Sequence, residues 1–223
     1  KLDKKKSINF SVPTGNFGDV YAGYLSKKMG LPIDKLIVAT NQNDILHRAI
    51  SSGKYIANQV EQTISPSMDI QVASNFERLI YDVLNQNSNK TKDAMNKFKK
   101  EKKYTIDNES IARIKNNFLS ESLNQKETLE VIKKNYEKHG VILDPHTAVG
   151  LGAVNKLGFD KDCVILSTAH PCKFPEAINQ AIQKNENLPE ELNYILGEKE
   201  NFDIIENNLE TIKNYINQKL NEN

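Results

Sequence analysis

A short glycine-bearing turn between a strand and a helix constrains this chain more than any other feature. Apolar side chains alternate on a strand period at residues 8–12, and they take helical spacing at residues 20–29. The connection between them, residues 14–19, carries Gly15 and Gly18 and is named here the glycine loop. Such a turn aims backbone N–H groups and the positive end of a helix dipole at one place, and glycine lets the backbone approach an anion. The sequence therefore predicts a phosphate site at the start of an α/β unit.

The polar residues of the glycine loop fit the same geometry. Asn16 suits the turn and Asp19 suits the helix N-cap. The glycine spacing matches neither the dinucleotide fingerprint nor the Walker loop, which needs a lysine and a hydroxyl after its second glycine. On spacing alone, an ordinary strand-to-helix turn with an Asp cap explains the segment equally well.

Length and charge exclude several classes of protein. The chain has 223 residues, enough for a substantial core, and it contains 30 basic and 29 acidic residues, so its net charge is close to zero. No basic stripe marks a nucleic-acid surface, and no apolar run has membrane-spanning length. The two cysteines, Cys163 and Cys172, form neither a disulfide framework nor a metal cluster. We expect a cytoplasmic protein with no metal site and no nucleic-acid or membrane partner.

The outer parts of the chain follow an α/β pattern. Short apolar or β-branched runs bounded by turn residues predict buried parallel strands at 8–12, 36–39 and 164–167. Amphipathic or small-residue runs predict helices at 20–29, 44–51, 148–157, 175–183 and 206–220. The fold class is therefore α/β, a partial parallel sheet flanked by helices. Because three strands leave such a sheet incomplete, we expect the chain to be the C-terminal portion of a larger protein.

The middle of the chain has a different character. Residues 64–139 contain no convincing strand, and helical patterns occur at 74–84, 93–98 and 128–137, with another after Asp107. We expect this part, about 64–139, to be a helical insertion. The α/β segments on either side are 1–60 and 140–223.

Five separate blocks of sequence resemble one known family. The first is the segment 11–19 followed by 22–23 and 28–32. The others, in chain order, are 39–44, 67–72 with 74–79, 144–150 and 166–177. They resemble threonine synthase, in particular its longer microbial and fungal branch, and they cover roughly the C-terminal half of such an enzyme. The family uses pyridoxal phosphate and has the tryptophan-synthase-β-like fold, fold type II. The resemblance implies that this chain is part of the large domain of that fold.

The resemblance also implies which residues hold the cofactor. In the family the glycine loop binds the cofactor phosphate, which here implies the ligands Gly15, Asn16, Phe17, Gly18 and Asp19. A hydroxyl at the end of a late strand bonds the pyridine nitrogen, and Thr168 occupies the matching position. A nearly neutral hydroxyl leaves that nitrogen largely unprotonated, which tunes how strongly the ring withdraws electrons. Without the resemblance, we would expect the Thr168 hydroxyl to cap the turn that follows it.

Substrate contacts follow from the position of two polar residues. Asn43 and Arg48 come just after the second predicted strand, at the edge where open α/β sheets bind ligands. Arg48 suits a substrate carboxylate or phosphate, and it suits a surface ion pair equally well. His146 and His170 lie at element ends, where a lone histidine is more often a structural hydrogen-bonding residue than a catalyst.

No catalytic residue is assigned within this chain. The family's Schiff-base lysine lies far upstream of the glycine loop, and the lysines here lie in charged, solvated runs. The resemblance implies that the full enzyme converts O-phospho-L-homoserine and water to L-threonine and phosphate. We expect the isolated chain to lack that activity, because its expected partner, the N-terminal half of the same protein with the lysine, is missing.

Two alternatives remain open. A relative with the same fold, such as a threonine dehydratase or a cysteine synthase, is disfavoured by the long helical insertion and by blocks 144–150 and 166–177. A non-catalytic threonine-synthase-like protein or fragment that binds a phospho-ligand is the other alternative. A lysine-bearing segment before Lys1 would distinguish it from the enzyme.

Overall fold

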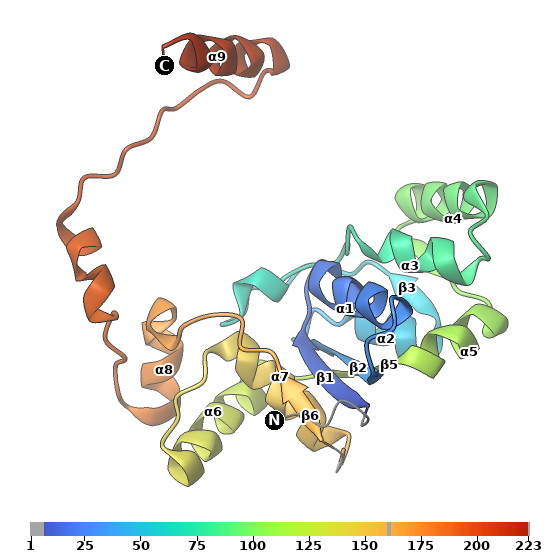
Figure 1. Ribbon diagram of the computed structural model, residues 1–223, viewed down its shortest axis with the longest axis horizontal. Coiled ribbons are helices and arrows are strands. Elements are labelled where there is room, and N and C mark those ends of the chain that lie inside the picture. Colours follow the sequence, from blue (N-terminus) through green and yellow to red (C-terminus); the bar gives the residue numbers. More distant parts are fainter. Residues whose placement is uncertain (1–6, 160–161, 223) are drawn as a thin grey trace. The chain divides into compact units, whose positions relative to one another are not determined.

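The computed structural model describes residues 7–159 and 162–222. Four strands form the main sheet: β1 (Ile8–Pro13), β2 (Ile33–Thr40), β5 (Phe118–Ser122) and β6 (Cys163–Ile165). Their order is β5-β2-β1-β6, and every neighbouring pair is parallel. The α/β class expected from the sequence is therefore confirmed. The strands and the helices around them can be followed in Figure 1.

The two faces of the sheet are covered by different helices. Side chains at alternate positions of β2 pack to opposite sides, so Leu36 and Val38 join one core cluster and Ile37 and Ala39 join another. The first cluster includes residues of α1 (Gly18–Lys28), α2 (Ile45–Ser52) and α3 (Phe76–Val83), and the second includes residues of α7 (Pro145–Lys156). This alternation explains why β2 is a nearly continuous apolar run.

Glycines on helix α7 let its backbone lie close to neighbouring side chains. A Cβ added at Gly152 would lie 2.1 Å from the Leu123 side chain, and one at Gly150 would lie 3.1 Å from Ile165. The Ser11 hydroxyl donates a hydrogen bond to the carbonyl of Gly150 at 2.7 Å. The small residues of this segment therefore let the helix backbone approach β1 and β6.

The expectation that residues 64–139 hold no strand was wrong. β4 (Lys103–Thr105) pairs antiparallel with β3 (Lys54–Ile56), and β5 adds a fourth strand to the main sheet beside β2. β4 has only three residues, too few to show a period. β5 reads Phe-Leu-Ser-Glu-Ser, which does not alternate, and its pairing with β2 over Leu36–Thr40 determines its conformation.

The helices of the sequence prediction are present with shifted ends. The predicted helix at 93–98 extends to Ser88–Glu101, because Asn87 caps its first turn by accepting from Lys90 N–H. The remaining helical elements are η1 (Pro66–Met68), α4 (Ser88–Glu101), α5 (Asn108–Asn117), α6 (Gln125–His139), η2 (Pro171–Lys173), α8 (Pro175–Ile182), η3 (Glu190–Gly197) and α9 (Leu209–Asn221).

The chain divides into two compact units at Glu186 and Asn187. The first unit holds the sheet and all helices to α8, and the second holds η3 and α9. Asn208 caps α9 by accepting from the N–H groups of Glu210 and Thr211. Among the described residues, no helix combines the length and the apolar character needed to cross a bilayer.

Candidate functional site

A small cavity lies beyond the carboxyl ends of strands β1 and β6. It has a volume of about 160 Å³ and is named here the strand-end cavity. Its lining residues come from five segments and are Pro13, Gly15, Ser67, Met68, His146, Thr168, Ala169, Lys173 and Phe174. Gly15 follows β1 and Thr168 follows β6, so the sheet brings together two residues that are far apart in the sequence. This edge is where ligands bind in open α/β sheets.

The glycine loop has a fixed backbone shape. Phe17 is the N-cap residue of α1 and has a left-handed backbone with φ of 70°. The Asn16 side chain accepts a hydrogen bond from Gly18 N–H at 2.9 Å. Asn75, at the start of α3, donates its backbone and side-chain N–H groups to the Asn16 carbonyl at 3.0 and 3.2 Å. The loop is therefore held on both sides, by its own turn and by α3.

The loop packs directly against the segment that contains η1. A Cβ at Gly15 would lie 2.5 Å from the carbonyl oxygen of Ser67, so only glycine fits this contact. The backbone N–H groups of Gly15, Asn16 and Phe17 donate no hydrogen bond to any described residue. Together with the N-terminus of α1, they form a cluster of donors available to an anion.

The predicted cap of α1 was wrong. Phe17, not Asp19, occupies the N-cap, and no side chain caps this helix. Asp19 lies in the exposed first turn, where its charge suits the helix dipole. The Phe17 ring is fully buried, edge-on to Phe76 at 5.1 Å and 5.7 Å from Phe118. The buried ring holds Phe17 in a backbone conformation that an aromatic residue rarely adopts.

Thr168 presents a free hydroxyl near the cavity. Its backbone N–H donates to Thr147 Oγ1 at 3.2 Å, while its side chain is exposed and makes no hydrogen bond to a described residue. The following turn, η2, is capped by His170, whose Nδ1 accepts from Cys172 N–H at 3.2 Å. The Thr168 hydroxyl is therefore not used as the cap of that turn.

The two residues predicted to contact substrate do not line the cavity. Asn43 is buried, and its Nδ2 donates to the Glu61 carbonyl at 2.8 Å and to Asp69 Oδ1 at 3.0 Å. Arg48 Nε of α2 pairs with Asp44, the N-cap residue of that helix, at 2.7 Å. Both side chains thus make structural contacts in this chain. For Arg48, the partner in the structure is the carboxylate of Asp44, as the alternative interpretation of an ion pair expected.

Three polar lining residues were not assigned to the site from the sequence. His146, Ser67 and Lys173 each come from a different segment. His146 is 5% exposed, accepts from Ser67 N–H through Nε2 at 3.3 Å, and lies 4.9 Å from the Phe174 ring. Each lies within one of the five blocks that resemble the family, and that resemblance was the only sign of a role in the site. No local pattern shows that the three residues lie side by side in the fold.

A buried carboxylate supports this side of the cavity. Burial raises the pKa of Asp144, but hydrogen bonds from His146 and Thr147 outweigh it and hold that pKa below its usual value. Asp144 therefore remains an anion that accepts hydrogen bonds, although it is 1% exposed.

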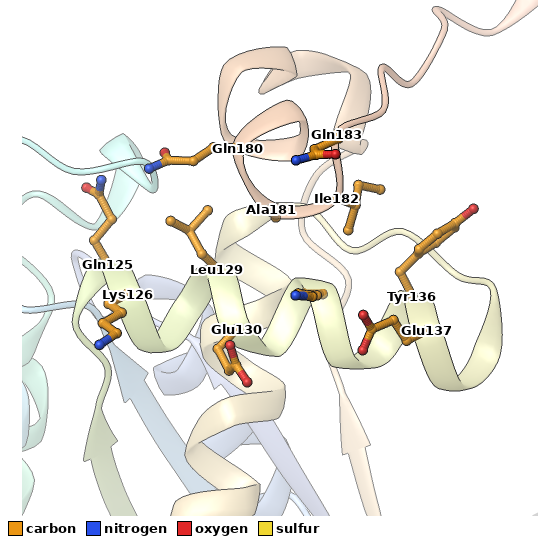
Figure 2. A pocket seen from close by; sticks show the side chains of 11 residues that line it. Gln125, Lys126, Leu129, Glu130, Tyr136, Glu137, Gln180, Ala181, Ile182 and Gln183 are labelled. Atoms are coloured by element: carbon orange, nitrogen blue, oxygen red, sulfur yellow. The ribbon is translucent and has the colours of Figure 1, made fainter.

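A larger groove lies elsewhere on the same unit, between α6 and α8. Figure 2 shows Leu129 and Tyr136 of α6 facing Ala181, Ile182 and Gln183 at the end of α8. Its volume is about 750 Å³, but none of the residues predicted for the site lines it. The strand-end cavity is the better candidate because it combines free backbone donors, a buried histidine and a hydroxyl.

Known proteins similar to this chain are threonine synthases. A family model described as "Threonine synthase, C-terminal" matches residues 147–216. Threonine synthase of Pseudomonas aeruginosa is 40% identical over 96% of this chain and 46% of its own length. Threonine synthase of Saccharomyces cerevisiae is 43% identical over 96% of this chain and 47% of its own length. Human threonine synthase-like 1 is 36% identical over 85% of this chain and 26% of its own length.

The fold agrees with these matches. The crystal structure of PLP-bound threonine synthase from Brucella melitensis aligns with a TM-score of 0.90 and 39% identity, over 96% of this chain and 46% of that one. This chain thus spans about half the length of the relatives it matches. The chain belongs to the threonine synthase family and corresponds to a C-terminal portion of its members.

Proposed function

We propose that this chain is the C-terminal portion of a pyridoxal-phosphate-dependent lyase that converts O-phospho-L-homoserine and water to L-threonine and phosphate. The observation that carries the proposal is that Gly15 and Thr168 line one cavity. The resemblance assigns those positions to opposite ends of one coenzyme, its phosphate and its pyridine nitrogen. A single cavity that contacts both positions is the arrangement this assignment requires.

The glycine loop fits a phosphate group. The N–H groups of Gly15, Asn16 and Phe17 are unused by described residues, and the close contact at Gly15 leaves no room for a side chain. Phosphate oxygens accept several hydrogen bonds and are stabilised at a helix N-terminus. We assign the cofactor phosphate to the glycine loop, chiefly to the free N–H groups of Gly15, Asn16 and Phe17. Because Gly18 N–H donates to Asn16 Oδ1, the Asn16 side chain has the role of shaping the loop.

The Thr168 hydroxyl suits the other end of the coenzyme. It is exposed and free of hydrogen bonds to described residues, and its backbone is fixed through Thr147. Pyridoxal phosphate, when bound, supplies an electron sink for carbanion chemistry. The part of Thr168 is to hold a hydrogen bond at the ring nitrogen without placing a full charge there.

Lys173 is suited to an anionic group of the substrate. Apart from His146, it is the basic residue among those lining the strand-end cavity. O-phospho-L-homoserine carries a phosphate and a carboxylate, and the glycine loop is already assigned to the cofactor phosphate. An ammonium at the cavity edge attracts such a group from water.

The Schiff-base lysine is proposed to lie in a preceding segment of the same protein. The relatives are about twice the length of this chain, which leaves room for such a segment. We propose that the two parts complete one active site and that this chain alone forms no threonine. The free thiols of Cys163 and Cys172 favour a reducing compartment, for which we propose the cytoplasm.

A threonine-synthase-like protein without synthase activity is the second candidate. It is favoured by the 36% identity to human threonine synthase-like 1. Such a protein would use the same loop to bind a phospho-ligand. The identity to the Pseudomonas and yeast threonine synthases is higher, which favours the enzyme.

One assay separates these candidates. The full-length protein that carries this chain is purified from a host lacking threonine synthase and supplied with pyridoxal phosphate and O-phospho-L-homoserine. Equal amounts of threonine and phosphate support the proposal, and 2-oxobutyrate formed from added threonine would instead indicate a dehydratase. Binding of phosphohomoserine without either product would favour the second candidate, and the isolated chain serves as the inactive control.

A further inference from the structure

The carboxylate of Asp144 connects two side chains that lead to different walls of the strand-end cavity. Asp144 is the N-cap of α7 and is 1% exposed. Its Oδ1 accepts from the backbone N–H and from Nδ1 of His146, at 2.9 and 3.0 Å. Its Oδ2 accepts from the hydroxyl of Thr147. The carboxylate therefore does more than cap a helix, because it also orients two neighbouring side chains.

The first connection leads to the glycine loop. Ser67 N–H donates to His146 Nε2 at 3.3 Å, so Nε2 carries a lone pair and the proton of the neutral ring lies on Nδ1, facing Asp144. The carbonyl of Ser67 is the atom against which Gly15 packs, at 2.5 Å from the position of an added Cβ. His146 thereby fixes the backbone segment on which the loop rests.

The second connection leads to Thr168. The hydroxyl of Thr147 has one hydrogen, and it is donated to Asp144. A lone pair of the same oxygen then accepts from the backbone N–H of Thr168 at 3.2 Å. Thr147 thereby fixes the backbone of the residue assigned to the pyridine nitrogen.

We propose that Asp144 is a positioning residue that sets both ends of the coenzyme site, the phosphate end through His146 and Ser67 and the ring end through Thr147 and Thr168. This inference rests on the proposed function of the strand-end cavity. Both connections require an acceptor at Asp144 that has no hydrogen of its own. A carboxylate provides two such oxygens, and a carboxamide provides only one.

The substitution Asp144→Asn tests this requirement while preserving the size of the side chain. If the amide nitrogen faces His146, Nδ1 must accept, the proton moves to Nε2, and the bond from Ser67 N–H is lost. If it faces Thr147, the hydroxyl loses its acceptor and is free to turn away from Thr168. Either orientation disturbs one of the two connections.

Two conservative variants each remove one of the two connections from Asp144 and leave the other in place. His146→Asn keeps a donor near the position of Nδ1 and removes Nε2, so it deletes the bond to Ser67. Thr147→Val keeps the shape and removes the hydroxyl, so it deletes the bond to Thr168. Asp107→Asn is the matched control, because Asp107 caps α5 by accepting from Ser110 N–H at 2.9 Å and from its hydroxyl at 2.8 Å, and does not line the cavity.

The measurement uses nitrogen-15 NMR of the full-length protein that carries this chain, titrated with pyridoxine 5′-phosphate, which has no aldehyde to react with lysines. We expect His146 of the wild-type chain to be protonated on Nδ1, and Asp144→Asn to shift that tautomer or the Thr168 amide. We expect its affinity for the ligand to fall about tenfold, and that of each single-connection variant about threefold. Asp107→Asn should lower thermal stability without changing the affinity.

The outcomes are distinct. A full-length Asp144→Asn variant that binds as tightly as wild type, or that leaves His146 and Thr168 unchanged, would overturn the inference. So would a full-length wild-type protein that does not bind the ligand. The proposed function fails separately, when the full-length wild-type protein binds coenzyme but forms no threonine.

Discussion

Gly15 packs against the carbonyl oxygen of Ser67 so closely that a Cβ would lie 2.5 Å from it. The contact joins the loop after β1 to the η1 segment, which is far along the chain. It leaves the backbone of Gly15 at the wall of the strand-end cavity, with its N–H group free of described partners. The phosphate site therefore depends on a backbone contact that a side chain would prevent.

We expect Gly15→Ala to lower the affinity for the coenzyme by about tenfold or more, because a methyl group against a backbone oxygen forces the loop or η1 to move. Equilibrium binding of pyridoxal phosphate to the full-length protein measures this effect. Gly197→Ala is the control, since nothing lies within 4 Å of a Cβ there. Unchanged binding in Gly15→Ala would show that the loop does not hold the coenzyme.

Phe17 links the loop to the core. We expect Phe17→Ala to lower the free energy of unfolding by about 3–5 kcal/mol, because it removes a fully buried ring from its contacts with Phe76 and Phe118. Phe202→Ala is the matched control, since that ring is 66% exposed. Urea denaturation of the chain measures both variants, and equal losses in the two would contradict the packing described.

Thr168 is expected to affect ligand binding and not stability. Its side chain is exposed and free of hydrogen bonds to described residues, so Thr168→Ala should change the free energy of unfolding by less than about 0.5 kcal/mol. The same variant should change the absorption spectrum of the bound coenzyme and weaken its binding about threefold to tenfold. Thr168→Ser restores the hydroxyl and should restore both properties. A spectrum that is identical in Thr168→Ala would remove Thr168 from the site.

Lys173 is expected to act on substrate affinity. We expect Lys173→Gln to raise the KM for O-phospho-L-homoserine about tenfold, because it removes a charge that attracts an anion, and to leave coenzyme affinity unchanged. Lys133→Gln makes the same change in the groove between α6 and α8 and is the control. Steady-state kinetics of the full-length variants provide the comparison, and equal KM values for the two variants would argue against the assignment.

The pH dependence of stability should report on Asp144. The folded protein holds the pKa of Asp144 below its usual value of about 3.9, so this carboxylate stabilises the fold above that pH. The contribution is lost as the pH falls through the lower, folded-state pKa. The difference in free energy of unfolding between wild type and Asp144→Asn should be constant from about pH 5 to 8 and should shrink below about pH 4.

Urea denaturation of the isolated chain at several pH values checks this expectation. Asp93→Asn is the control, because Asp93 is exposed on α4 and makes no hydrogen bond to a described residue. A difference for Asp144→Asn that grows as the solution becomes more acidic would mean that the sign of the pKa shift is wrong.

The elements with strong periodic patterns could be predicted from the sequence. The strand at 36–39 is apolar throughout because β2 is covered on both faces, and the helices follow their caps and apolar spacing. The strand Phe118–Ser122 was missed because its conformation depends on pairing with β2 and not on its own pattern. Phe17 was not expected as an N-cap, because its left-handed backbone depends on a ring buried among residues distant in the sequence.

The candidate site also has a part that could be predicted from the sequence and a part that only the folded chain shows. The glycine loop is a local signal, so its place after β1 and before α1 followed from its residues. The contact between Ser67 and His146 joins residues 79 positions apart, and only the folded chain shows it. Asn43 and Arg48 were placed at the correct edge of the sheet, but their neighbours Asp69 and Asp44 engage them in structural contacts.

The central claim is that one coenzyme bridges the glycine loop and Thr168. A crystal structure of the full-length protein with pyridoxal phosphate tests it most directly. The account predicts phosphate oxygens within hydrogen-bonding distance of the free N–H groups of the glycine loop, and the pyridine nitrogen within the same distance of Thr168 Oγ1. A phosphate bound away from the loop, or a ring nitrogen facing a residue other than Thr168, would contradict it.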